Sequence, residues 1–110
     1  MSNSYITDSS PASDHEKLTV AATAVGPTAG TISVNQAGGF HKRAIRAFLT
    51  VETGPCRIRF DGGAATSSSG HLLVEGDSFT VEGESNVSNI SLIRTSGVSA
   101  EVSLTYFFNL

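Results

Sequence analysis

Residues 57–108 read RIRFDGGAATSSSGHLLVEGDSFTVEGESNVSNISLIRTSGVSAEVSLTYFF. Apolar and polar residues alternate in short runs along this stretch, and Gly and Ser interrupt the runs. Alternation with a period of two, broken repeatedly by turn residues, is typical of antiparallel β-sheet. The same stretch holds no arrangement of side chains that would run an obvious reaction. The pattern therefore predicts an all-β protein that presents surfaces, and not an enzyme.

The alternation extends towards the N-terminus and gives seven or eight strands, spaced about 8–12 residues apart. Strands are expected at residues 18–25, 30–35, 41–52, 56–60, 71–74, 78–82, 89–94 and 100–108. Residues 41–52 also show helical spacing, but their continuation into a β-prone Thr-Val-Glu-Thr run favours a strand. The spacing predicts a single antiparallel β-sandwich of jelly-roll type.

Turn residues and side-chain parity add detail to this prediction. Gly54-Pro55 is expected to turn a hairpin between the strands on either side of it, and residues 75–77 a second hairpin. In the strand after Pro55, Cys56, Ile58 and Phe60 are expected to face inwards and the residues between them outwards. The last strand is expected to bury Ala100, Val102, Leu104, Tyr106 and Phe108. Residues 84–88 are predicted to form a loop.

The N-terminal segment differs in composition from the rest of the chain. Residues 1–16 are polar, contain Pro11 and clustered Ser, and lack periodicity. We expect this segment to be either a disordered terminus or an extended arm that orders against a neighbouring subunit. Tyr5 and Ile6 would anchor such an arm. The β-sandwich domain is expected to occupy residues 17–110.

Composition excludes some function classes. The 110 residues carry seven Lys or Arg against ten Asp or Glu, a formal net charge of −3. Binding along a nucleic-acid backbone requires a concentrated basic face, so no nucleic-acid partner is expected. Charged residues make up 15% of the chain, against about 25% in an ordinary soluble domain. The deficit fits either a protein that hides much of its surface in an assembly or a plain Ser/Thr-rich β domain.

Cysteine and histidine give no sign of a reactive centre. Cys56 is the one cysteine, so no intramolecular disulfide can form, and an inward-facing Cys is normally a small inert hydrophobe. The three histidines lack the short spacings of metal ligands, so neither a metal nor another cofactor is expected. No signal-peptide pattern or membrane-length apolar run occurs. We therefore expect synthesis in a cytoplasm and no membrane partner.

One row of charges is a candidate contact surface. Arg57, Arg59 and Asp61 are expected on one outward face, and Arg94 would join them if its strand lies nearby. Arginine makes specific bidentate contacts with carboxylates, so the row is either a subunit contact or a solvated sheet face. If it is a contact, replacing both Arg57 and Arg59 with Ala should weaken assembly and leave folding intact.

Several phrases of the sequence resemble a known group of proteins. The phrases are residues 50–53 (TVET), 57–62 (RIRFDG), 70–73 (GHLL), 76–77 (GD), 89–90 (NI), 93–94 (IR) and 104–107 (LTYF). Together they resemble small proteins encoded in tailed-bacteriophage genomes, usually among the structural genes near the major capsid protein. The resemblance covers roughly residues 43–108, and it departs from the group's pattern at residues 63–65, where members often carry a Thr and a Pro.

This resemblance implies a non-enzymatic role in the virion. The expected function is that of a capsid decoration or cement protein, which binds the phage head in many copies and stabilises it. Its partners would be the major capsid protein or other virion proteins, and further copies of itself, most simply as a homotrimer. A neck, collar or tail component is the alternative within this class.

An alternative of another class is a cupin-like enzyme or ligand-binding module. Residues 70–77 share the Gly-Asp turn chemistry of cupins, but the paired histidines of metal-binding cupins are missing. Such a module would also need convergent polar groups inside the sandwich, where apolar residues are expected.

Overall fold

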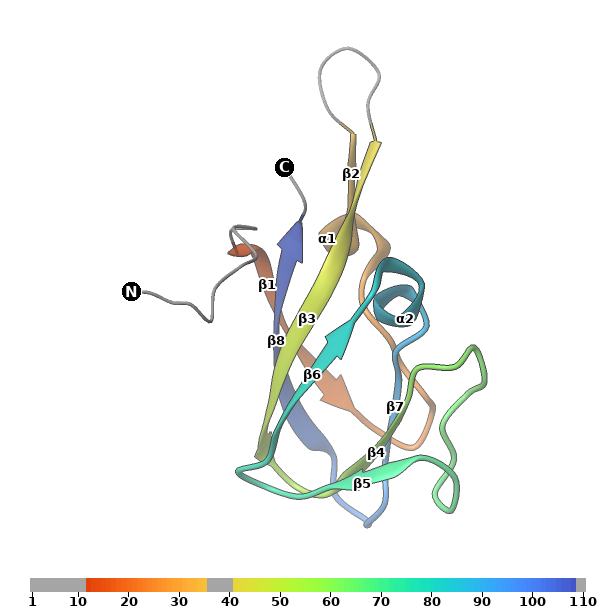
Figure 1. Cartoon of the computed structure of the whole chain (residues 1–110). Coiled ribbons are helices and arrows are strands. Elements are labelled where there is room, and N and C mark those ends of the chain that lie inside the picture. The colour runs from red at the N-terminus through yellow and green to blue at the C-terminus, as the bar shows by residue number, and fades with distance from the viewer. Residues whose placement is uncertain (1–11, 36–40, 109–110) are drawn as a thin grey trace.

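The computed structural model describes residues 12–35 and 41–108 and consists mainly of strands (Figure 1). The strands are β1 (Ala12–Val20), β2 (Ser33–Asn35), β3 (His41–Thr53), β4 (Cys56–Arg59), β5 (His71–Leu73), β6 (Ser78–Glu82), β7 (Ser91–Arg94) and β8 (Ala100–Phe108). Two short helices, α1 (Ala29–Ile32) and α2 (Glu84–Ser88), lie between strands. In this part of the chain, no helix has the length and apolar character needed to cross a membrane.

The strands form two antiparallel sheets. The larger sheet has the order β1-β8-β3-β2, and β6 pairs with β3 further along the same strand. The smaller sheet has the order β5-β4-β7. The prediction of an all-β antiparallel sandwich is confirmed. Its assignment to the jelly-roll type stays a prediction.

The core lies between the two sheets and follows the parity of the sequence. Strand β8 alternates strictly, with Ala100, Val102, Leu104, Tyr106 and Phe108 buried and the residues between them partly exposed. Cys56 and Ile58 of β4 are fully buried, as predicted, and Phe60 packs against the core while partly exposed. Because β8 pairs with both β1 and β3, it is the central element of the larger sheet.

Both predicted hairpins are wrong. Strand β3 belongs to the larger sheet and β4 to the smaller one, so Gly54-Pro55 carries the chain from one sheet to the other. The link between β5 and β6 does the same, and backbone hydrogen bonds join Val51 to Asp77 and to Gly76 there. Turn residues mark where the chain reverses, but a tight turn does not specify whether the next strand pairs with the previous one or stacks across from it.

Three further segments differ from the sequence expectation. Strand β1 begins at Ala12, so residues 12–16 belong to the sheet although the sequence assigned them to an arm. A strand was expected at residues 30–35, but residues 29–32 form α1 and only residues 33–35, which are β2, pair with another strand. Residues 84–88 form α2 instead of a loop, because Val87 is fully buried and fixes one turn of helix against the core.

Candidate functional site

A long loop joins β4 to β5 along one side of the smaller sheet (Figure 1). Two arginines of β4 hold it in place. Arg57 donates from Nε to the backbone carbonyl of Ser67 at 3.0 Å and from Nη1 to that of Gly70 at 2.9 Å. These bonds satisfy two carbonyls of a loop that has few backbone partners of its own. Arg57 therefore fixes the far end of the loop to β4.

Arg59 holds the near end of the loop through Asp61. The guanidinium donates from Nε to Asp61 Oδ1 at 3.0 Å and from Nη2 to Oδ2 at 2.8 Å, which is the bidentate geometry of a strong ion pair. The backbone N–H of Gly63 also donates to Asp61 Oδ1, at 3.2 Å. The bond from Arg59, followed by that from Gly63, lowers the pKa of Asp61 to about 2. Asp61 is therefore ionised at any physiological pH.

Gly63 has a steric role beside this ion pair. A Cβ at this position would lie 2.3 Å from Nη2 of Arg59. The backbone of Gly63 therefore lies against the guanidinium, and a side chain would push the arginine away from Asp61.

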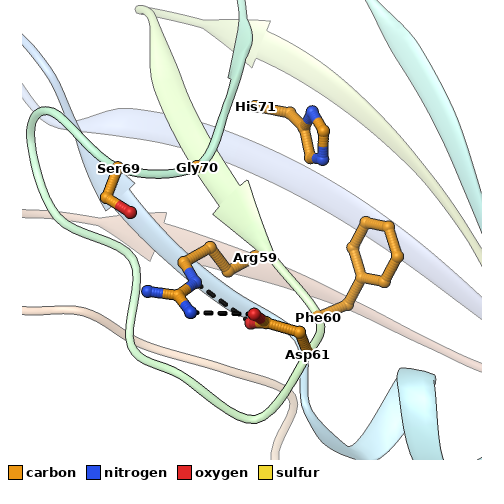
Figure 2. A pocket seen from close by; sticks show the side chains of 6 residues that line it. All are labelled: Arg59, Phe60, Asp61, Ser69, Gly70 and His71. Atoms are coloured by element: carbon orange, nitrogen blue, oxygen red, sulfur yellow. Dashed lines mark hydrogen bonds and ion pairs between the residues drawn. The ribbon is translucent and has the colours of Figure 1, made fainter.

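The loop and the edge of the smaller sheet line an open pocket of about 390 Å³ (Figure 2). Its lining residues are Arg59, Phe60, Asp61, Ser69, Gly70 and His71. Figure 2 shows the Arg59–Asp61 pair in the middle of the pocket, Ser69 on one side and the rings of Phe60 and His71 on the other. The pocket thus has a polar wall and an aromatic wall.

The aromatic wall belongs to a cluster at the open edge of the sandwich. The rings of Phe60 and His71 have centroids 5.9 Å apart and lie within 23° of parallel, and Phe79 of β6 lies 5.8 Å from Phe60 and 6.5 Å from His71. Strands β5 and β6 lie at edges of their sheets, and Phe79 and Phe60 pack against the core. The cluster therefore closes the gap between the two sheets on this side.

The structure brings three of the six predicted contact residues together. Arg57 and Arg59 of β4 both bind the β4–β5 loop, Arg59 and Asp61 line the pocket, and each of the three makes contacts within its own chain. Arg94 is in register with Cys56 and not with Arg57. Paired residues lie on the same face of a sheet, so Arg94 does not extend the charge row. Tyr5 and Ile6 lie outside the described residues.

Cys56 has the character that the sequence predicted. Its side chain is fully buried, and burial raises the pKa of the thiol to about 11, with a smaller contribution from the charge of Asp77. The thiol therefore stays protonated at neutral pH, and a protonated thiol is a poor nucleophile.

A second surface, not anticipated from the sequence, is the outer face of the larger sheet. Two neighbouring rows of paired residues cross β1, β8, β3 and β6: His15–Thr105–Phe48–Thr80 and Lys17–Ser103–Thr50–Ser78. Most of these side chains are hydroxyls. Phe48 is 42% exposed near the centre of the face. The sequence did not show which strands would flank Phe48.

Two pairs of oppositely charged groups lie on this face. Lys17 Nζ lies 3.0 Å from Glu52 Oε1, and Ser103 donates to the same carboxylate. Arg46 stacks on the ring of Phe107, 4.5 Å from its centroid, and lies 4.0 Å from Glu82. The face is therefore rich in hydroxyls and carries few charges without a counter-charge.

No protein-family model matches the chain, and neither curated proteins nor solved structures give a match. Within residues 12–35 and 41–108, no group of three or more His, Cys, Asp or Glu side chains is placed to hold a metal ion. The resemblance to phage virion proteins stays a prediction from the sequence.

Proposed function

We propose that this protein is a structural component of a tailed-phage particle, most simply a decoration protein that binds the outside of the head. The observation that supports this best is the outer face of the larger sheet, which comprises the two rows above and the neighbouring side chains Arg46, Glu52, Glu82 and Phe107. It offers hydroxyls, two aromatic rings and paired charges on one side of the sandwich.

The size of the face suits a specific contact. Four strands about 4.8 Å apart and about nine residues long cover on the order of 600 Å² in projection. A standard protein interface buries about 800 Å² on each partner, so the corrugated surface of this face is close to the required area.

The chemistry of the face also suits protein contact. Interface centres are depleted in unpaired charge and enriched in aromatic residues and Arg. Here the side chain of Glu82 is 69% exposed but lies near Arg46, and Lys17 lies near Glu52. If a partner covers this face, each of these four charged side chains is therefore buried together with an opposite charge. We propose that this face contacts the major capsid protein, with Phe48 at the centre of the contact.

The strand order supports the jelly-roll type within this proposal. Strand β1 pairs with β8, the first with the last, and the two sheets take strands from both halves of the chain. Val25 forms a bridge to Leu92 at the free edge of β7, which would supply the fourth strand position of the smaller sheet. The described residues form eight strands, five in the larger sheet and three in the smaller, and a jelly roll also has eight.

The copy number of the protein in purified particles tests the proposed function. Quantitative mass spectrometry against the major shell protein is expected to give a ratio near one, or a simple fraction such as one third. A homotrimer at local three-fold positions is the expected arrangement. A ratio of a few per hundred would move the protein to the neck, collar or tail. Absence from particles would refute a virion role.

A matched pair of variants tests the contact face. Phe48→Glu places a charge at the centre of the face, whereas Val98→Glu places one on a residue that is 64% exposed in the turn before β8. An unpaired charge in a buried interface costs several kcal/mol, so Phe48→Glu should lose rebinding to stripped particles while Val98→Glu keeps it. Equal rebinding by both variants would remove this face from the contact.

A further inference from the structure

We infer that the pocket between the β4–β5 loop and the rings of Phe60 and His71 is a binding site for a neutral pyranose sugar. The inference goes beyond the proposed virion role and does not depend on it. It rests on the two unlike walls of the pocket, on the charge balance of its lining, and on polar atoms of the lining that have room for further hydrogen bonds.

The aromatic wall suits the apolar face of a sugar ring. A pyranose presents axial C–H groups on one face, and such groups pack favourably on the electron-rich face of an aromatic ring. His71 is exposed, and its ring stacks on Phe60 at 5.9 Å while Phe79 supports both rings. The rings are therefore held in place before a ligand arrives, which reduces the entropy lost on binding.

The polar wall offers acceptors and donors for hydroxyl groups. A carboxylate has about four lone-pair sites, and Asp61 uses them for Arg59 Nε, Arg59 Nη2 and the Gly63 N–H. Oδ2 thus retains an acceptor position, and the side chain is 63% exposed. Within the described part of the chain, neither the Ser69 hydroxyl nor the ring nitrogens of His71 make a hydrogen bond.

The charge balance selects a neutral ligand. Arg59 and Asp61 are the formally charged residues of the lining, and they neutralise each other in a bidentate pair. An anion would meet Asp61, and a cation would meet Arg59. A sugar hydroxyl can donate to the carboxylate without disturbing the pair.

The size of the pocket fits a small ligand. A volume of about 390 Å³ lies at the lower end of the roughly 300–1,000 Å³ typical of ligand sites. A site open to solvent that takes one or two sugar rings is expected to bind with a dissociation constant in the millimolar range. Both a free sugar and the terminal residues of a surface polysaccharide have this chemistry.

Amide chemical shifts of the full chain provide the test. The ¹⁵N-labelled protein is titrated separately with methyl α-D-glucopyranoside, methyl β-D-galactopyranoside and N-acetyl-D-glucosamine, and with dextran as a polymer. We expect at least one sugar to shift the amides of Gly63, Ser69, Gly70 and His71 in a saturable way. Tighter binding per site of the polymer would identify a polysaccharide as the ligand, and equal binding a free sugar; both support the inference.

Variants and charged probes complete the design. Ser69→Ala removes a hydroxyl that holds no part of the fold, and His71→Ala removes one aromatic ring; each should weaken binding several-fold or more. His15→Ala is the matched control, because His15 is an exposed histidine on the outer face of the larger sheet. The inference is overturned if no sugar shifts these amides, if Ser69→Ala and His71→Ala both bind like the unmodified protein, or if phosphate or choline binds at the pocket in preference to every sugar.

Discussion

Asp61 is the residue whose titration reports on the loop. Its pKa is lowered from 3.8 to about 2, chiefly by the bond from Arg59. Because the folded-state pKa is below the unfolded value, the ionised carboxylate stabilises the fold above about pH 3.8, and this contribution is lost as the pH falls through about 2. We expect Arg59→Ala to move the midpoint of the Asp61 carboxyl signal, followed by NMR, back towards 3.8. An unchanged midpoint would show that the ion pair does not form in solution.

Cys56 provides a second residue-level test. Burial raises the pKa of its thiol from 9.0 to about 11. The unfolded chain therefore loses this proton first, and the contribution of Cys56 to stability falls as the pH rises from about 9 towards 11. Near pH 8, the folded protein should react with a disulfide reagent far more slowly than the protein in urea, since only the thiolate attacks. Rapid labelling of the folded protein, at the rate found in urea, would contradict the burial of Cys56.

For Arg57 and Arg59, the sequence pattern predicted the orientation of the side chains but not their partners. Alternation along β4 predicted that both face outwards, and they do. Their partners are the carbonyls of Ser67 and Gly70 and the carboxylate of Asp61. All three belong to a loop without hydrophobic periodicity, so the sequence did not predict where the loop lies. The double replacement of these arginines with Ala is now expected to loosen the loop as well, so weakened assembly alone would not identify a subunit contact.

The link from β3 to β4 depends on Gly54. Its φ is +76°, and a Cβ there would lie 3.1 Å from the Cα of Ala100 and 3.2 Å from the carbonyl oxygen of Ser99. Both the backbone strain and the crowding oppose a side chain at this position. Gly54→Ala should therefore lower the free energy of unfolding by about 1–3 kcal/mol in urea titrations.

Substitutions at two other glycines distinguish the cost of backbone strain from the cost of steric crowding. Gly76 also has a positive φ, +91°, but a Cβ there would meet nothing within 4 Å. Gly97 has open space and no positive φ. Gly76→Ala should therefore cost about 1–2 kcal/mol and Gly97→Ala less than about 0.5 kcal/mol. Because crowding adds to strain only at Gly54, Gly54→Ala should cost more than Gly76→Ala. If the Gly54 variant were no less stable than the Gly76 variant, the close approach of Gly54 to Ala100 would be wrong.

The elements themselves were more predictable than their pairing. The strands predicted at residues 78–82 and 100–108 match β6 and β8. A strand with one buried face has apolar residues at every second position, so its own sequence reveals it. Pairing depends on which sheet a strand enters, and turn residues such as Gly54-Pro55 do not encode that choice. The aromatic cluster was missed for the same reason, since Phe60, His71 and Phe79 come from segments whose proximity follows from the stacking of the two sheets.

The two proposed surfaces belong to different layers of the sandwich. The contact face is the outer side of the larger sheet, and the pocket is formed by β4, β5 and the loop between them, in the smaller sheet. A molecule seated by its contact face would therefore keep the pocket accessible. We expect Phe48→Glu to lose particle binding with no change in the sugar titration, and Ser69→Ala to show the opposite. Joint loss of both activities in either variant would contradict this separation.

The stability of the molecule depends on the central position of β8. Leu104 is fully buried and lies in register with Leu49 of β3 and Glu16 of β1, whereas Leu72 of β5 is 52% exposed. Truncation of a buried Leu to Ala costs about 2–5 kcal/mol, out of a total stability of about 5–15 kcal/mol for a domain of this size. Urea unfolding should therefore show a large loss for Leu104→Ala and a loss of less than about 1 kcal/mol for Leu72→Ala. Leu104 is buried because β8 lies between β1 and β3 in the larger sheet. Similar losses for the two variants would therefore contradict the central position of β8.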